Sequence, residues 1–206
     1  MKFLEYSLES YRVESERLAK KVELAGYQPD CVAYLARGAW QIGDACANWF
    51  GVPLVELSAH RSGDAVKDDA HSVLSALPSC LKHLVRRVEI AWRLSRRDNS
   101  QQEKSCRLAD RFPVPDHVGF LLLVDDSADT GTSIKAARRL LHELFPSAEL
   151  RVAVINSFPP AREAKLIDWS LHEDCLTSTP MSKDNRDYER ACAAYACFRS
   201  SRKVEM

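Results

Sequence analysis

The chain has 206 residues, of which 46% are hydrophobic and 28% are charged, and its 29 basic residues balance 29 acidic ones. This composition is typical of a globular protein and argues against a disordered chain, a globally basic nucleic-acid binder and a protein with an acidic tail. Seven cysteines without zinc-type spacing indicate free thiols in a reducing compartment, and no secretory signal or apolar run of roughly 20 residues is visible, so we expect a cytoplasmic protein without a membrane span.

The first hundred residues begin with a predicted helix over Leu4–Leu24, which Gly26 would end. The apolar run Cys31–Leu35 predicts a short buried strand. Helical spacing resumes through Ile42–Trp49, and Val52–Leu57 predicts a second strand.

Residues 58–118 predict a helical insert, in which Pro78 separates two helical patterns. Between Lys82 and Arg111 there are nine basic and four acidic residues, so the neutral total conceals a basic segment. An apolar face in the insert must be shielded from water, and we expect a second subunit to bury it in a homodimer or higher oligomer. The alternative is that the insert folds back as a lid on its own subunit. The residues of this face are Leu77, Leu81, Leu84, Val85, Val88 and Trp92.

The remaining elements are a strand over Phe120–Val124, a helix over Ser133–Phe145 and a strand over Leu150–Asn156. Alternating strands and helices favour an α/β fold with a parallel sheet flanked by helices. The last 50 residues mix short strands with a helical stretch near Tyr188–Phe198. At this length we expect a single domain over residues 1–206.

The segment 121–133 carries the chemistry, because its apolar strand delivers Asp125 and Asp126 directly before a turn and a helix N-terminus. Ligands of open parallel sheets bind beyond the carboxyl ends of the strands. The turn 129–133 offers backbone N–H groups, hydroxyls and the positive end of a helix, which together suit a phosphate. Two adjacent carboxylates suit ribose hydroxyls or a hydrated Mg²⁺. The alternative is an acidic strand end with an ordinary helix cap.

This segment resembles the phosphoribosyl-pyrophosphate (PRPP) motif of type I phosphoribosyltransferases. Residues 36–39 (Ala-Arg-Gly-Ala) are similar to the pyrophosphate loop of that family, and 28–30 and 51–54 also match its pattern. The resemblance implies an enzyme that makes a nucleoside 5′-monophosphate from PRPP and a nitrogenous base, with Mg²⁺, and releases pyrophosphate. It also implies the family fold, here with the insert at 58–118 and a C-terminal base-binding hood at 157–206.

The resemblance assigns roles residue by residue. Asp125 and Asp126 would hold the ribose hydroxyls and the metal, and Asp129 would be the general base for a purine-type base. The 5′-phosphate would be bound by Asp129, Thr130, Gly131, Thr132 and Ser133. Pyrophosphate would be bound by Ala36, Arg37 and Gly38, and some family members carry a cis peptide at the position of Ala36–Arg37.

The C-terminal part is similar, more weakly, to the hood of 6-oxopurine transferases. There Asp184 would contact the metal or base and Arg190 would bind pyrophosphate, unless this is a loop leading into a solvated helix. Trp169 or the segment 171–177 would stack on the base, unless Trp169 is core. Asn156 would hydrogen-bond the base near the position where 6-oxopurine enzymes carry a lysine, which this chain lacks.

Two functions follow from these features. The first is a phosphoribosyltransferase acting on a purine-like base, with PRPP and the base as its partners. The alternative is a regulatory protein of the same fold that senses PRPP or a nucleotide and binds nucleic acid or a protein partner, for which the segment 82–111 would supply the basic surface. The presence of Asp129 favours the enzyme, because a sensor would not need a general base.

Overall fold

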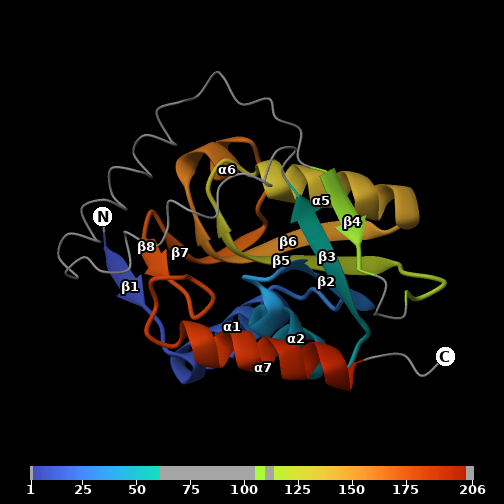
Figure 1. Ribbon diagram of the computed structural model, residues 1–206. Helices are drawn as coiled ribbons and strands as arrows, with labels where there is room; N and C mark the ends of the chain where they lie inside the picture. The colour runs from blue at the N-terminus through green and yellow to red at the C-terminus, as the bar shows by residue number, and fades with distance from the viewer. Residues whose placement is uncertain (1, 61–104, 110–113, 203–206) are drawn as a thin grey trace.

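The computed structural model describes residues 2–60, 105–109 and 114–202 (Figure 1). The described strands form a six-stranded sheet in the order β4-β3-β2-β5-β6-β7, and every neighbouring pair is parallel except β3 with β4. This confirms the predicted parallel sheet. Its strands are β2 (Cys31–Ala36), β3 (Leu54–His60), β4 (Ser105–Leu108), β5 (Phe120–Ala128), β6 (Glu149–Ser157) and β7 (Trp169–Glu173).

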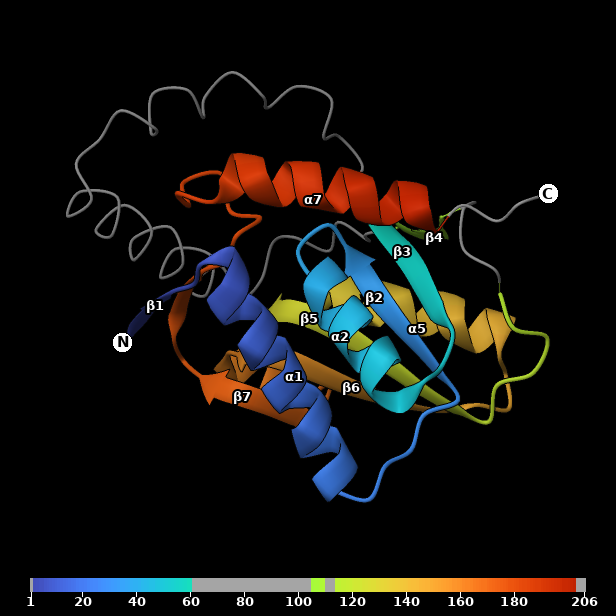
Figure 2. The same cartoon turned by 90° about the horizontal axis from the view of Figure 1, so that it is seen from below.

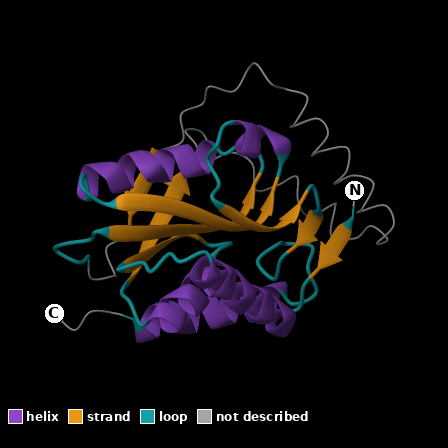
Figure 3. Ribbon diagram, turned by 180° about the vertical axis from the view of Figure 1, so that it is seen from behind, coloured by secondary structure: helices purple, strands orange, loops and turns teal. Residues whose placement is uncertain are grey.

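Helices cover both faces of this sheet, and the three layers are visible edge-on (Figure 3). One face carries α1 (Leu8–Leu24), α2 (Trp40–Phe50) and α7 (Tyr188–Ser201) (Figure 2). The other face carries α5 (Thr132–Leu144) and the short α6 (Pro159–Glu163). None of the helices in the described ranges has the length and apolar character needed to cross a membrane.

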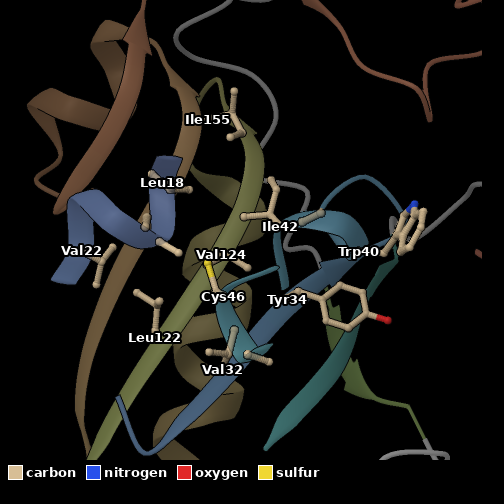
Figure 4. Packing of buried hydrophobic residues seen from close by; sticks show 14 of the residues in the cluster. Leu18, Val22, Val32, Tyr34, Trp40, Ile42, Cys46, Leu122, Val124 and Ile155 are labelled. Carbon is tan, nitrogen blue, oxygen red and sulfur yellow. The ribbon is translucent and has the colours of Figure 1, made fainter. Parts of the chain in front are cut away.

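The core lies on both sides of the central strands. On one face Leu122 of β5 packs with Leu18 of α1 and Cys46 of α2 (Figure 4). On the other face Leu123 packs with Leu141 of α5. All five side chains are at most 1% exposed. A strand that is buried on both faces needs apolar residues at every position, which is why this part of the sequence does not alternate.

The strand β5 is longer than the sequence predicted. Its pairing with β6 continues past Val124, with Asp125 opposite Val154 and Ala128 opposite Ser157. The predicted end at Val124 is therefore wrong, because ladder hydrogen bonds to β6 carry the polar residues along as strand. Asp125 and Asp126 therefore lie in the last part of strand β5 and not in the loop that follows it.

The predicted insert is narrower than residues 58–118. Strand β3 runs to His60, and β4 returns antiparallel to it, with His60 opposite Ser105. Both ends of the segment thus belong to the sheet, with β4 at its edge and β3 between β4 and β2. The helical patterns around Pro78, and with them the apolar face expected at an oligomer interface, lie outside the described residues.

Two elements of the segment 157–206, predicted as a C-terminal hood, belong to the main body of the fold. Strand β7 is part of the main sheet, and α7 packs on the core, where Tyr195 lies 6.0 Å from Trp40 between ring centroids. What stands apart is a two-stranded parallel pair of β1 (Phe3–Glu5) with β8 (Leu176–Ser178). The N-terminal residues therefore complete this small unit, a long-range pairing that no local pattern indicated.

Ion pairs anchor the last turns of α7. Arg199 lies 3.1 Å from Glu56 of β3, a carboxylate that is 1% exposed, and Arg202 lies 2.8 Å from Asp44 of α2. The Tyr34 hydroxyl donates a hydrogen bond to the second Glu56 oxygen. Glu56 is thus a buried charge with partners on both oxygens, the condition under which burial of a carboxylate is tolerated.

Candidate functional site

The two loops that resemble the family motif meet at one edge of the sheet. Strands β2 and β5 are parallel neighbours, so the loops that follow them leave the sheet side by side. A Cβ added at Gly38 would lie 2.4 Å from Oδ2 of Asp126 and 2.8 Å from its Cγ. A side chain at residue 38 would therefore displace the Asp126 carboxylate or the loop. The fold thus brings the two predicted motifs into contact.

The loop after β2 has the backbone that the resemblance implies, since the Ala36–Arg37 peptide is cis. The backbone turns back at once, with the N–H of Ala39 donating to the carbonyl of Leu35 at 3.2 Å. Helix α2 begins directly after the loop, at Trp40. Ala39 offers no capping side chain, and the N–H of Trp40 donates to the carbonyl of Arg37 at 3.4 Å, so the N–H groups that follow it carry the positive end of α2.

The loop after β5 is a tight turn into α5. Gly131 has φ +73° and directly precedes the first helical residue, Thr132. The hydroxyls of Thr130 and Thr132 lie 2.8 Å apart and share a hydrogen bond. A Cβ at Gly131 would lie 2.2 Å from Cδ1 of Leu166. The segment after α6 thus presses against this turn and holds the N-terminus of α5 beside the sheet edge.

Three carboxylates stand at this edge: Asp125 and Asp126 lie within β5, and Asp129 directly follows its last residue. The N–H of Asp126 donates to Oδ1 of Asp125 at 2.9 Å, and the Ser127 hydroxyl donates to Oδ1 of Asp129 at 3.2 Å. Burial raises the pKa of Asp126, and the charge of Asp129 raises it further, while the hydrogen bond with Asp125 lowers it. Three acidic side chains therefore lie close together at this edge, where they can accept hydrogen bonds from hydroxyl groups or bind a cation.

The residues expected in the hood are arranged differently from the prediction. Asp184 is exposed in the loop between β8 and α7. Within the part of the chain that the structure describes, no three or more acidic, histidine or cysteine side chains are grouped to hold a metal. Asp184 therefore does not join Asp125 and Asp126 in the predicted metal-ligand set.

Arg190 ties α7 to α1. It lies 2.9 Å from Glu9 and 3.3 Å from Asp187, and these bonds, mainly the one with Glu9, raise its pKa. Asp187 also accepts a hydrogen bond from the N–H of Leu8, at 2.9 Å. Arg190 would have to exchange these carboxylates for a ligand before it could bind pyrophosphate.

Two residues expected at the base have structural roles instead. Asn156 is fully buried, and its amide donates to the carbonyl of Cys175 and accepts from the Cys175 N–H, at 2.8 and 3.3 Å. Trp169 begins β7 and packs against Tyr27, with ring centroids 5.5 Å apart, on the core cluster under α1. The amide of Asn156 is therefore engaged by backbone, and Trp169 is a partly buried residue that packs on the core.

The pattern of the sequence did not single out Tyr11. It lies in the second turn of α1, where an aromatic residue at helical spacing is most simply interpreted as core. It is 1% exposed, yet its hydroxyl has no hydrogen-bond partner among the described residues. A buried hydroxyl without a partner is visible only in three dimensions.

Comparison with known families agrees with this geometry. A model of the phosphoribosyl transferase domain family matches residues 8–174, which include both loops and the strands that carry them. The chain belongs to this family. It is therefore a phosphoribosyltransferase with the family's α/β fold. No curated protein matches the chain.

Solved structures share the fold at low identity. A purine phosphoribosyltransferase from Pyrococcus horikoshii aligns with a TM-score of 0.58 at 13% identity, over 89% of this chain and 95% of its own. A xanthine-guanine-hypoxanthine phosphoribosyltransferase from Helicobacter pylori gives 0.53 at 15%, over 85% and 91%. A hypothetical protein from Neisseria gonorrhoeae with bound ppGpp gives 0.53 at 17%, over 96% and 98%.

Proposed function

We propose that this phosphoribosyltransferase transfers the 5-phosphoribosyl group of PRPP to a purine-like base and releases pyrophosphate. The observation that carries the proposal is the contact between Gly38 and the Asp126 carboxylate. It juxtaposes an anion-binding loop with a hydroxyl-binding carboxylate, and PRPP carries pyrophosphate directly beside the ribose hydroxyls.

PRPP would span the edge of the sheet. Its 5-phosphate would lie on the turn 129–133, where the N-terminus of α5 and the hydroxyls of Thr130 and Thr132 provide donors. Asp125 and Asp126 would accept hydrogen bonds from the ribose hydroxyls. Pyrophosphate would lie against residues 36–38, near the N-terminus of α2.

The family generally uses Mg²⁺ with PRPP, and the residues here fit that ion. Mg²⁺ is usually held by one or two carboxylates together with substrate phosphates and water. Asp125 and Asp126 supply two adjacent carboxylates, and PRPP would supply the phosphates. When bound, the ion would neutralise charge on the departing pyrophosphate, as would the guanidinium of Arg37.

Asp129 would act on the incoming base. It follows the ribose-binding pair by three residues, and the Ser127 hydroxyl holds one of its oxygens and leaves the other for a ligand. It would accept the proton that the attacking ring nitrogen loses as the bond to the anomeric carbon forms. The choice of a purine-like base rests on this acid and on the substrates that the descriptions of two structural neighbours give.

The test is pyrophosphate release from PRPP, measured with hypoxanthine, guanine, xanthine, adenine, orotate and uracil. We expect release that depends on a purine. Asp126→Ala should weaken PRPP binding roughly 10- to 100-fold in calorimetric titrations, the value of a hydrogen bond to a charged group. The matched control is Asp116→Ala, an exposed aspartate in the segment that leads into the opposite end of β5. Wild-type protein that binds no PRPP, or releases pyrophosphate only with a pyrimidine, would contradict the proposal.

A second candidate is a nucleotide-sensing protein that uses the same site. It is favoured by the Neisseria gonorrhoeae neighbour, which is described with bound ppGpp and aligns over 96% of this chain. A guanosine with 5′- and 3′-pyrophosphates also places phosphate groups on a ribose, with the 2′-hydroxyl left free to bind a carboxylate. Binding of ppGpp by the wild-type protein, without pyrophosphate release from PRPP with any of the six bases, is the result that favours the sensor.

A further inference from the structure

Arg162 joins two strands at the edge of the sheet that carries the proposed site. It lies in α6, and its Nη1 donates to the carbonyl of Ser157, the last residue of β6, at 2.6 Å. Its Nη2 donates to Oδ2 of Asp174, the residue that follows β7, at 2.9 Å, and its Nε lies 3.9 Å from the carboxylate of Glu173. A guanidinium is a planar fork with fixed donor directions, so these bonds hold the ends of β6 and β7 relative to each other.

The β7–β8 junction, residues 174–175, is held to β6 by further hydrogen bonds. The N–H of Asp174 donates to the carbonyl of Ser157 at 3.0 Å, and the side-chain amide of Asn156 bonds both backbone groups of Cys175. Asp174 has φ +55°, a conformation that a residue other than glycine keeps only where its surroundings hold it. Strand β8 begins at the next residue, so these contacts set the direction in which it leaves the main sheet.

Arg162 and the β7–β8 junction lie beside the proposed site. In the ladder between β5 and β6, Ser157 is opposite Ala128, and the N–H of Phe158 donates to the carbonyl of Ala128 at 3.0 Å. Asp129, the proposed general base, follows Ala128 in the chain. Neighbouring strands are about 4.8 Å apart, so the junction, which continues β7 beyond β6, lies about 10 Å from the end of β5.

The order of the strands indicates the side from which a base would arrive. The strands run β2-β5-β6-β7, with the proposed pyrophosphate loop after β2 and the proposed ribose carboxylates at the end of β5. In a displacement at the anomeric carbon, the nucleophile approaches opposite the leaving group, because the forming and breaking bonds are aligned. Pyrophosphate that leaves on the β2 side therefore requires a base that enters on the β6 side, where the β7–β8 junction stands.

Arg151 provides an internal comparison at the other end of the same strand. It bonds Glu149 at 2.8 Å and Asp168 at 2.9 Å, and Asp168 directly precedes β7. Arg151 and Arg162 thus each connect β6 with one end of β7 through a carboxylate, and both are partly exposed. The two arginines are matched in their ion pairing and differ in which edge of the sheet they hold.

We infer that Arg162 is a positioning residue for the incoming base. By bonding Ser157 and Asp174 it holds the β7–β8 junction, and the start of β8 with it, on the side of the site from which the base attacks. The loops proposed to bind PRPP follow β2 and β5 and do not depend on this contact, so Arg162 serves the base and not PRPP. This inference rests on the proposed function, because it requires PRPP to bind at the ends of β2 and β5.

The experiment compares Arg162→Ala with Arg151→Ala. The KM for the base that the wild type uses best is measured by pyrophosphate release at saturating PRPP, the PRPP affinity by calorimetric titration, and the stability by thermal unfolding. We expect Arg162→Ala to raise the KM for the base roughly 10- to 100-fold, as a displacement of about 1 Å can do, with unchanged PRPP affinity. Arg151→Ala should lower the melting temperature about as much as Arg162→Ala and leave the KM for the base unchanged.

The inference is overturned if Arg162→Ala leaves the KM for the base unchanged, if it weakens PRPP binding by the same factor, or if Arg151→Ala raises the KM equally. Should Arg162→Ala fail to fold, Asp174→Asn decides, since it keeps an acceptor oxygen and removes only the charge that pairs with Arg162. We expect that variant to raise the KM for the base roughly threefold, and an unchanged KM overturns the inference. An active wild type with unaffected variants removes this inference alone, whereas a wild type that releases no pyrophosphate with any base removes the proposed function as well.

Discussion

Replacement of Gly38 by alanine tests whether the two loops work as one site. The new Cβ would lie 2.4 Å from Oδ2 and 3.2 Å from Oδ1 of Asp126, where ordinary contact begins at 3.4 Å. The carboxylate or the loop must therefore move by about 1 Å, and a shift of this size costs about 100-fold when a reacting group is misplaced. The backbone at residue 38 does not have a positive φ, so the change is steric and not a matter of glycine's conformational freedom.

We expect Gly38→Ala to weaken PRPP binding by about 10- to 100-fold, because Asp126 can no longer hold its ribose hydroxyl. Calorimetric titration measures the affinity, and thermal unfolding checks that the protein is folded. The matched control is Gly119→Ala, whose Cβ would lie 3.1 Å from a carboxylate oxygen of Asp30 at the opposite end of β5. That variant should retain PRPP affinity.

A double variant identifies the route of the effect. If Gly38→Ala acts by displacing the Asp126 carboxylate, then combining it with Asp126→Ala should be no worse than Asp126→Ala alone. A folded Gly38→Ala protein with wild-type affinity for PRPP would refute the reasoning. Additive losses in the double variant would show that the glycine serves the loop independently of Asp126.

Three further outcomes are expected. Asp129→Asn keeps the shape and removes the proton acceptor, so kcat should fall roughly 10²- to 10⁴-fold with little change in PRPP affinity, and an unchanged kcat would remove Asp129 from the chemistry. Gly131→Ala should lower the melting temperature and the PRPP affinity together, because the φ of +73° disfavours a side chain and the new Cβ would lie 2.2 Å from Cδ1 of Leu166. A variant as stable as the wild type in thermal unfolding would contradict this expectation. Burial raises the pKa of Cys46 to about 12, so a thiolate-selective reagent at pH 8 should modify the exposed Cys197 and leave Cys46 unmodified in the native protein. Peptide mass spectrometry maps the modified residues, and rapid labelling of Cys46 would be inconsistent with its burial.

Local patterns were sufficient for much of the fold and for the motifs of the site. The apolar run from Cys31 predicted a strand one residue shorter than β2, and the order of strands and helices predicted the parallel sheet. The residues 125–133 and 36–38 are each contiguous in the sequence, so their chemistry could be interpreted without knowing the fold. The common reason is that a buried strand and a strand–turn–helix motif are specified by neighbours in the chain.

The sequence pattern failed where the partner of a residue is distant in the chain. Trp169 is equally consistent in sequence with a base-stacking surface and with core, and its contact with Tyr27 becomes visible only in the folded chain. Asn156 has the groups to bind a base, but the backbone of Cys175 takes both of them. The neighbouring sequence does not indicate whether a polar side chain will form its hydrogen bonds with the protein or with a ligand.

The sequence by itself therefore determined which groups we propose for binding a phosphoribosyl substrate, because the motif residues adjoin one another along the chain. Only the tertiary structure decided how those groups are assembled. The parallel pairing of β2 with β5 placed Gly38 against Asp126, and the packing of α1 on the sheet buried Tyr11 where the charges of the same carboxylates act on it. Such contacts join segments far apart in sequence, and they depend on burial and steric fit, which emerge only when the chain has folded.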